Sequence, residues 1–347
     1  MTFLGIRKRA LASVFGMSAT CCALLTGQTV TRSGGATYVT FGAPNGADST
    51  YPVSMNVFFT ITGYDSSGLG FVRNPWGTIT SFDPPGGLDT EPRGINAMGT
   101  ITGNYNDANS KWHGFIRSGT GQFATFDPDG SIFTTPFAIN NGGAIAGVYQ
   151  KEPGPYPWAV QHGFVRAPDG TITAFDMPGA GWTLPVSINA AGVIAGFYYE
   201  TATPRVRGFV RYPQGQTTAF DVPGSAGMSV VGIDALGRVT GVFGDANGTH
   251  GYIRDAAGSV TAFDAPGSTA TYPTSINQAG VITGYYADSS PSRLYHGFIR
   301  QVNGAITSFD LPGSTGTFPQ CINDLNAVVG WATNDHNSVD AFLRLPN

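Results

Sequence analysis

Four histidines and four aspartates recur at a spacing that could support acid–base or metal chemistry. Each aspartate follows its histidine by 14 residues, in the pairs His113 and Asp127, His162 and Asp176, His250 and Asp264, and His296 and Asp310. A His–Asp pair can act as a catalytic dyad, and a group of histidines can bind a metal ion. The pairs lie in separate copies of a repeat and cannot converge on one ion. We interpret them as structural pairs between neighbouring strands, with a catalytic dyad as the alternative, and expect no metal site.

Three glutamates are the other candidates for chemistry. They are Glu91, Glu152 and Glu200, and the chain has no further glutamate. Two carboxyl groups about 5–10 Å apart could hydrolyse a glycosidic bond. Scattered acidic residues in loops could equally serve solubility. The three glutamates therefore define the alternative function, a glycoside hydrolase or lyase.

Aromatic residues in variable segments suggest binding rather than catalysis. Rings beside a few polar groups suit the faces of sugars or a peptide. The alternative is that these loops pack on their own rings. The residues assigned to the binding set are Tyr51, Tyr156, Trp158, Trp182, Tyr198, Tyr272 and Phe318.

An internal repeat positions all of these residues. A Phe-Asp pair recurs six times between Phe82-Asp83 and Phe309-Asp310, with a degenerate copy at Phe41-Gly42. Gly-Phe-Ile/Val-Arg and Ile-Asn motifs recur in the same order, with variations, in seven copies. A period of 41 to 49 residues is typical of repeat architectures in which each copy is one supersecondary unit.

Each copy reads as four short strands. Residues 273–310 contain four segments rich in β-branched and aromatic residues, bounded by Gly, Pro, Asn or Asp. Four antiparallel strands per copy predict the blade of a β-propeller. The asparagine of Ile-Asn is expected to form the turn after the first strand, and a glycine within each second strand marks a close backbone approach. The sequence predicts an all-β protein, a single seven-bladed propeller.

The ends of the repeat array predict how the ring closes. The last copy stops after its third strand, whereas an orphan strand at about residues 37–42 precedes the first copy. Pairing this strand with the last copy would complete the final blade and leave no exposed sheet edge there. We therefore expect one closed domain over residues 37–347.

Two faces follow from this topology. The loop face carries the connections between second and third strands and those leading from one copy to the next, and it includes the channel mouth. The turn face carries the short hairpins. Loop-face segments differ most between copies, so the binding aromatics and the three glutamates are expected there.

The repeat resembles the HAF-type extracellular repeat, a bacterial family named for a His-Ala-Phe motif. The resemblance is clearest in Ile276-Asn277-Gln-Ala-Gly280-Val-Ile-Thr-Gly284 and in His296-Gly297-Phe298, and it covers roughly residues 38–345. This chain has Gly in place of the Ala and Arg where Trp is expected. The resemblance implies propeller-like repeats in an exported protein and no particular chemistry.

The N-terminal segment and the net charge indicate where the protein is located and which partners it can bind. Arg7, Lys8 and Arg9 precede a weakly apolar run, so residues 1–30 are predicted to be a signal peptide and 31–36 a linker. An uncleaved anchor is the alternative. Residues 1–36 hold four of the 18 basic residues and none of the 22 acidic ones, which leaves 14 basic, 22 acidic and a net charge of −8. That balance argues against nucleic-acid binding.

These observations predict a secreted or cell-envelope protein without a cofactor or a membrane span in its mature chain. Cys321, the sole cysteine after the predicted signal, is expected to be a buried, inert thiol, because it takes the position before the first-strand isoleucine where the other copies have Ser, Gly or Ala. The function we expect is that of a monomeric binding or scaffold propeller that recognises a carbohydrate or protein partner on the loop face.

Overall fold

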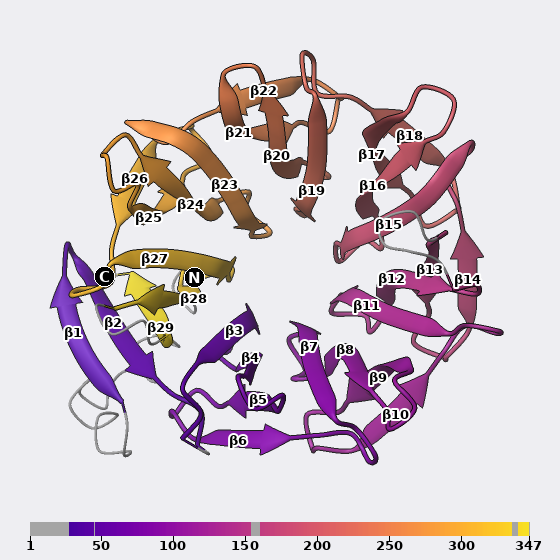
Figure 1. Ribbon diagram of the computed structural model, residues 1–347, viewed down its shortest axis with the longest axis horizontal. Helices are drawn as coiled ribbons and strands as arrows, with labels where there is room; N and C mark the ends of the chain where they lie inside the picture. The colour runs from indigo at the N-terminus through magenta and orange to yellow at the C-terminus, as the bar shows by residue number, and fades with distance from the viewer. Residues whose placement is uncertain (1–27, 45, 154–159, 335–338, 347) are drawn as a thin grey trace, which may run out of the picture.

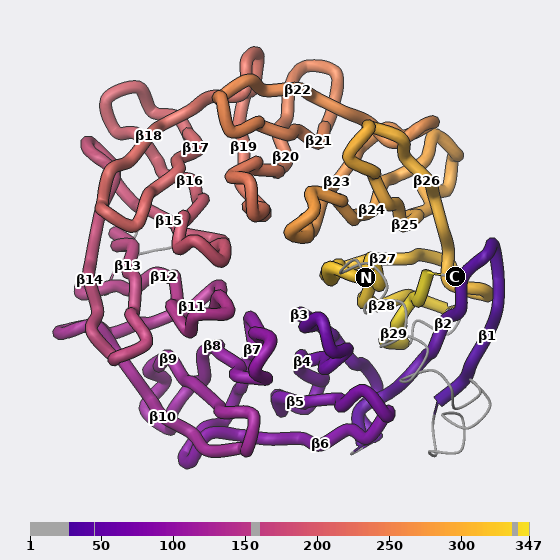
Figure 2. Tube along the Cα trace, turned by 180° about the vertical axis from the view of Figure 1, so that it is seen from behind, coloured from indigo at the N-terminus to yellow at the C-terminus, as the bar shows by residue number. Residues whose placement is uncertain are grey.

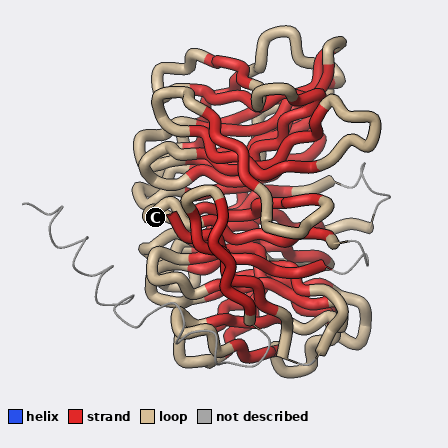
Figure 3. The backbone as a smooth tube through the Cα atoms, turned by 90° about the vertical axis from the view of Figure 1, so that its left-hand side faces the viewer, coloured by secondary structure: helices blue, strands red, loops and turns tan. Residues whose placement is uncertain are grey.

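The chain folds into strands arranged around a central opening, as Figure 1 shows. The computed structural model describes residues 28–44, 46–153, 160–334 and 339–346. Within these ranges the regular elements are all strands, and none is a helix that could cross a membrane. The side view in Figure 3 shows the strands lying between two layers of loops and turns. The predicted signal peptide, apart from its last residues, lies outside the described ranges.

Strands that follow one another in the chain pair with each other in antiparallel fashion. The pattern is simplest in β3 (Thr50–Met55), β4 (Ile61–Asp65), β5 (Gly70–Arg73) and β6 (Ile79–Phe82), which form a separate four-stranded sheet. We call such a group a strand set and name it by its first strand. The β3 set begins at the central opening with β3 and ends at the periphery with β6 (Figure 1).

The same order recurs along the chain. The next sets are β7 (Asp89–Ile95), β8 (Ile101–Asn106), β9 (Trp112–Arg117) and β10 (Phe123–Phe126); β11 (Phe133–Ile139), β12 (Ile145–Gln150), β13 (His162–Arg166) and β14 (Ile172–Phe175); and β15 (Ala180–Ile188), β16 (Ile194–Glu200), β17 (Arg205–Arg211) and β18 (Thr217–Phe220). Then come β19 (Gly227–Ile233), β20 (Val239–Asp245), β21 (Gly248–Arg254) and β22 (Val260–Phe263); and β23 (Ser268–Ile276), β24 (Ile282–Asp288), β25 (Tyr295–Arg300) and β26 (Ile306–Phe309). Single parallel bridges, such as Tyr295 to Gly316, join some neighbouring sets into larger sheets.

The last set combines both ends of the chain. It consists of β27 (Gly316–Ile322), β28 (Val328–Thr333) and β29 (Val339–Pro346), and β2 (Ala36–Phe41) pairs antiparallel with β29. This is the position that the sequence analysis assigned to the orphan strand. A further strand, β1 (Thr29–Ser33), forms a hairpin with β2 and lies outside it, so residues assigned to the signal and the linker are part of this sheet.

Arginine–phenylalanine pairs connect each set to the one before it. The motif arginine of every third strand lies over the motif phenylalanine of the preceding set, with the guanidinium carbon 4.6–5.1 Å from the ring centre. Arg73 of β5 lies over Phe41 of β2 in this way, which places the N-terminal strand in the role of an outer fourth strand. Each such cation–π contact contributes on the order of 0.5–2 kcal/mol.

A belt of asparagines connects the inner strands at the turn face. The Asn277 side chain accepts hydrogen bonds from the backbone of its own turn and donates one, of 3.0 Å, to the Asn323 carbonyl of the next set. Equivalent inter-set bonds start from Asn56, Asn96, Asn140, Asn189 and Asn323, the last reaching Asn56 across the chain ends. The asparagines therefore form the turn after the first strand, as expected, and they also bind the next strand set.

Glycine is required where the first and second strands approach most closely. A Cβ atom at Gly284 would lie 2.2 Å from the Tyr272 carbonyl oxygen, and the equivalent glycines give 2.0–2.4 Å. No side chain fits at such a distance. Each first strand also shifts register beside this glycine, as between Pro273 and Ser275.

Candidate functional site

The four histidines each bind the aspartate that the spacing predicts. The distances from His Nδ1 to the carboxylate are 2.6 Å for His113 and Asp127, 2.8 Å for His162 and Asp176, 2.9 Å for His250 and Asp264, and 3.0 Å for His296 and Asp310. The pairs lie in four different strand sets. In the described part of the chain, no three or more His, Cys, Asp or Glu side chains form a group that could hold a metal ion.

Three of these histidines contact a second carboxylate as well. His250 Nε2 lies 3.2 Å from Asp245, and Asp107 and Asp288 take the same place beside His113 and His296. Burial disfavours the charged imidazole of His250, but Asp264 and Asp245 outweigh it and raise the histidine pKa above its usual value. The same balance raises the pKa of His296. An imidazole between two carboxylates connects the end of the second strand to the residue that follows the fourth strand.

The three glutamates lie in three different strand sets. Glu91 is on β7 and Glu200 is at the end of β16, with the β11 set between their sheets, and Glu152 is exposed in the loop after β12. Hydrogen bonds from the Thr203 hydroxyl and the Arg207 guanidinium lower the pKa of Glu200. A lowered pKa is opposite to what a general acid requires.

One expected aromatic group proves to be partly core. Trp182 stacks on Tyr199, with ring centres 6.0 Å apart, and contacts Phe197 edge to face. Tyr198 is only 2% exposed and packs against Phe209 in the core. Tyr199 therefore occupies the surface position that the sequence analysis gave to Tyr198, because neighbouring residues in a strand point to opposite faces. Tyr156 and Trp158 lie outside the described residues.

Three other predicted aromatics join a larger group. Tyr51, Tyr272 and Phe318 occupy the same position in their first strands and face, across the strand pair, an aromatic residue of the second strand. The pairs Tyr51–Tyr64, Tyr272–Tyr285 and Phe318–Trp331 are stacked, with ring centres 5.4, 5.0 and 4.1 Å apart. All six rings are half-buried.

These pairs contact one another across strand sets. Phe318 of β27 contacts Tyr285 of β24, with ring centres 5.2 Å apart, and Tyr51 of β3 contacts Trp331 of β28 at 6.0 Å. Tyr295, which is 38% exposed, packs against both Tyr285 and Phe318. We call the seven rings the aromatic strip: Tyr51, Tyr64, Tyr272, Tyr285, Tyr295, Phe318 and Trp331. The inner strands β23, β27 and β3 that carry it are neighbours in both Figure 1 and Figure 2.

The same two positions carry other chemistry in the remaining sets. The equivalent cross-strand pairs are Glu91–Asn104, Thr135–Val148, Leu184–Phe197 and Ser229–Val242. Paired aromatic rings therefore occur in three adjacent sets out of seven. The sequence analysis named the first-strand residues but missed Tyr64, Tyr285 and Trp331. The available signal was that the residue after the invariant second-strand glycine varies between copies.

The tyrosine hydroxyls of the strip differ from those of the core. Within the described residues, the hydroxyls of Tyr51, Tyr64, Tyr272 and Tyr285 make no hydrogen bond. By contrast, the Tyr252 hydroxyl donates to the Ser229 carbonyl at 3.1 Å, and the hydroxyls of Tyr105 and Tyr286 bind side chains. The strip thus keeps polar groups available for a ligand.

A compact polar group borders the strip at its Tyr64 end. Glu91 Oε2 accepts hydrogen bonds from Arg93 Nη2 and, at 2.9 Å, from Asn104 Nδ2. Arg93 Nε also donates to Asn104 Oδ1 at 3.3 Å. Burial raises the pKa of Tyr64, and the charges of Arg93 and Glu91 act on that hydroxyl in opposite directions. We call Glu91, Arg93 and Asn104 the polar triad.

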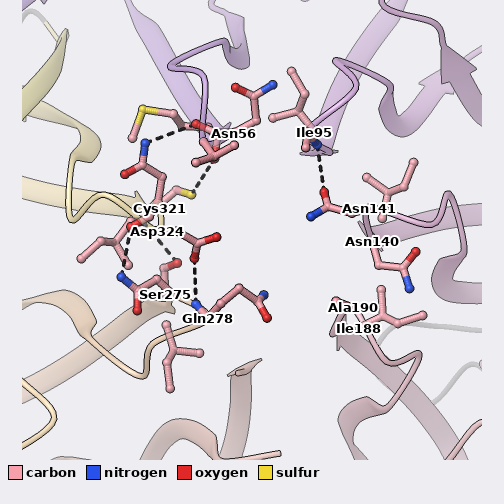
Figure 4. A pocket seen from close by; sticks show the side chains of 18 residues that line it. Asn56, Ile95, Asn140, Asn141, Ile188, Ala190, Ser275, Gln278, Cys321 and Asp324 are labelled. Carbon is pink, nitrogen blue, oxygen red and sulfur yellow. Dashed lines mark hydrogen bonds between the residues drawn. The ribbon is translucent and has the colours of Figure 1, made fainter. Parts of the chain in front are cut away.

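A small cavity lies on the axis at the turn face, shown in Figure 4. Its volume is about 200 Å³, and its walls come from belt asparagines such as Asn140, isoleucines such as Ile188, and Cys321. Burial raises the pKa of the Cys321 thiol, whose Sγ lies 3.9 Å from the Met55 carbonyl. The thiol is therefore a poor nucleophile. The residues that line the cavity are repeat positions that connect the strand sets.

Comparison with known proteins shows the fold. No family model matches the sequence, and no curated protein matches it either. Solved structures do: a streptogramin B lyase has a TM-score of 0.58 at 15% identity, covering 88% of this chain and 96% of its own. The virginiamycin B lyase of Staphylococcus aureus has a TM-score of 0.59 at 14% identity, covering 88% and 98%. The likeness at such identities establishes an all-β, propeller-like fold and nothing about activity.

Proposed function

We propose that the chain is a seven-bladed propeller of four-stranded blades, a HAF-type repeat protein closed by its N-terminal strand. Each strand set corresponds to one blade, and β2 supplies the fourth strand of the last, with β1 as an addition. The Arg73–Phe41 contact and the bond from Asn323 to Asn56 support closure, because both join the first blade to the last.

On this scaffold the protein acts as an exported binding protein that recognises a carbohydrate through the aromatic strip. The observation that carries the proposal is the restriction of paired aromatics to three adjacent sets at positions that the repeat leaves variable. A role in folding alone would place such pairs in all copies, as it does for the belt and the Arg–Phe contacts. Export is inferred from the basic and apolar residues at the N-terminus.

The chemistry of the strip suits sugar rings. Aromatic faces stack on the apolar faces of sugars, and hydroxyl, carboxylate and amide groups bind their hydroxyls. The strip combines stacked rings with tyrosine hydroxyls that have no partner among the described residues, and the polar triad adds further donors and acceptors at one end. A glycoside hydrolase or lyase has less support, because Glu91 is paired with Arg93 and the pKa of Glu200 is lowered.

A glycan array with the full chain tests the proposal, followed by titration calorimetry with the glycans that bind. Tyr285→Ala should weaken binding at least tenfold, while Phe197→Ala, the equivalent second-strand position in the β15 set, should leave it unchanged. Equal losses in the two variants would show that the strip is not the site. Absence of glycan binding by the wild type, or binding of a protein partner instead, would overturn the carbohydrate proposal.

A further inference from the structure

The electrostatics of the strip restrict the kind of carbohydrate it can take. Burial raises the pKa of Tyr285, and the described groups that also act on this hydroxyl are Tyr272 and Tyr295. The charges felt by Tyr64 are those of Arg93 and Glu91, which oppose each other. Among the described residues, the strip therefore presents neutral hydroxyls and rings to a ligand, and the charges beside it, Glu91 and Arg93, oppose each other.

The polar triad is neutral as a unit. Arg93 could bind the carboxylate of an acidic sugar, but its guanidinium is already paired with Glu91, and both side chains are about one-third exposed. A carboxylate approaching Arg93 would have to displace Glu91 or lie beside it, and both alternatives are unfavourable. Asn104 holds both partners, so the pair keeps its geometry while remaining accessible. Such an arrangement suits sugar hydroxyls, which donate to Glu91 and accept from Arg93.

The strip is also longer than one sugar needs. Six of its rings follow one another from Tyr272 to Tyr64, with successive centres no more than 6.0 Å apart. One sugar stacks on one or two of these rings, so several linked sugars are required to cover them. The triad lies beyond Tyr64 and would contact the sugar at one end of such a chain.

We infer that the strip binds an extended, uncharged oligosaccharide, with the Glu91–Arg93–Asn104 triad as a hydroxyl-binding subsite at one end. This inference rests on the proposed function and specifies its ligand. It predicts selectivity against uronic-acid chains, because Glu91 repels a carboxylate placed near Arg93.

Two series of ligands test it by calorimetry with the full chain: neutral glucose oligomers from mono- to hexasaccharide, and uronic-acid oligomers of the same lengths. Affinity for the neutral series should increase roughly threefold to tenfold with each sugar that reaches another ring. The uronic-acid series should bind at least about tenfold more weakly at equal length. Uronic-acid oligomers that bind as tightly as neutral ones would overturn the inference.

Removing the negative charge of the triad should reverse the selectivity. Glu91→Gln leaves Arg93 uncompensated, so uronic-acid binding should strengthen at least about tenfold while neutral chains weaken severalfold. Glu200→Gln, which removes a glutamate paired with Arg207 in another set, is the matched control and should change neither series. An unchanged charge preference in Glu91→Gln, or no affinity gain beyond the monosaccharide, would contradict the inference. Failure of both series to bind would contradict the inference, and absence of binding on the glycan array as well would remove the proposed function itself.

Discussion

The asparagine belt and the aromatic strip are built on the same inner strands but follow opposite rules. At the turn-face end of the first strand, the repeat keeps asparagine, whose side chain binds the next set. The single exception also keeps a contact to the next set. Asp234 replaces Asn there, and Arg238 pairs with it and donates to the Ala279 carbonyl of the next set at 2.8 Å. Five residues before the belt residue, on the same strands, the cross-strand pair varies between sets: it is Glu–Asn in one, Thr–Val in another and Leu–Phe in a third.

This contrast separates structural from functional positions without any second sequence. A contact that joins each strand set to the next constrains every copy, because one missing contact weakens the connection between two sets. The proposed binding site uses only some of the sets, so only some copies need its side chains. The His–Asp pairs lie between these extremes, since Arg207 and Asp221 replace them in the β15 set while keeping the contact.

The largest effect is expected from removing the strand that completes the last set. Deletion of residues 37–42 removes the buried side chains of Tyr38, Val39 and Phe41. At about 1.5–3 kcal/mol each, their loss costs roughly 5–9 kcal/mol, comparable to the whole stability of a typical domain. Thermal melting should show loss of the folded state, or size-exclusion chromatography should show oligomers that pair through the open edge.

A matched control for this deletion removes β1, residues 29–33, which covers the same edge from outside. Its side chains are half-buried or exposed, so the melting temperature should change little. A deletion of 37–42 that melts like the wild type and stays monomeric would disprove closure by the N-terminal strand.

The role of the asparagine belt can be tested in the β19 set, where Asp234 and Arg238 replace the asparagine. Arg238→Ala leaves the carboxylate of Asp234, which is fully buried, without its cation and should cost about 3–5 kcal/mol in the free energy of unfolding. Adding Asp234→Asn should recover much of this loss, because an amide removes the buried charge and can donate to the Asn277 carbonyl as in other sets. A double variant no more stable than Arg238→Ala in urea unfolding would contradict the equivalence.

Features within a strand set could be predicted from the sequence, whereas contacts between sets could not. The strands and their order could be predicted from motif spacing, because local periodicity determines them, and the partner of β2 could be predicted from the fourth strand that the last copy lacks. The inter-set bonds of the belt and the Arg–Phe contacts could not, since they join residues about one repeat apart. In the site, Tyr51, Tyr272 and Phe318 could be predicted from their variability between copies. Tyr64, Tyr285 and Trp331 could not, because the register between the first and second strands brings them opposite those residues.

The histidine pairs should make stability depend on pH. The pKa values of His250 and His296 are raised in the folded protein, so their contribution is present below the unfolded value of about 6.5 and is lost as pH rises through the folded values. Their aspartates are about half-exposed, which limits the effect to at most about 2 kcal/mol for both together.

A double variant with His250→Gln and His296→Gln should therefore unfold with a flatter pH dependence between pH 6 and 8. His250→Arg with His296→Arg is the matched control, because it imitates Arg207 and keeps the ion pairs without a titrating ring. The arginine variant should be as insensitive to pH as the glutamine variant but more stable. Retention of the wild-type pH profile by both would assign the titration to other groups.

The smallest effect concerns single hydroxyl groups and bears most directly on the contrast between core and strip. Tyr252→Phe removes a buried hydroxyl that donates to the Ser229 carbonyl, so it should cost about 1 kcal/mol in urea unfolding. Tyr51→Phe removes a hydroxyl without a partner among the described residues, so stability should stay within about 0.5 kcal/mol while oligosaccharide affinity falls. If Tyr51→Phe instead lowers stability and leaves affinity unchanged, the strip is part of the packing between sets. Its restriction to three sets would then need a structural cause that the other four lack.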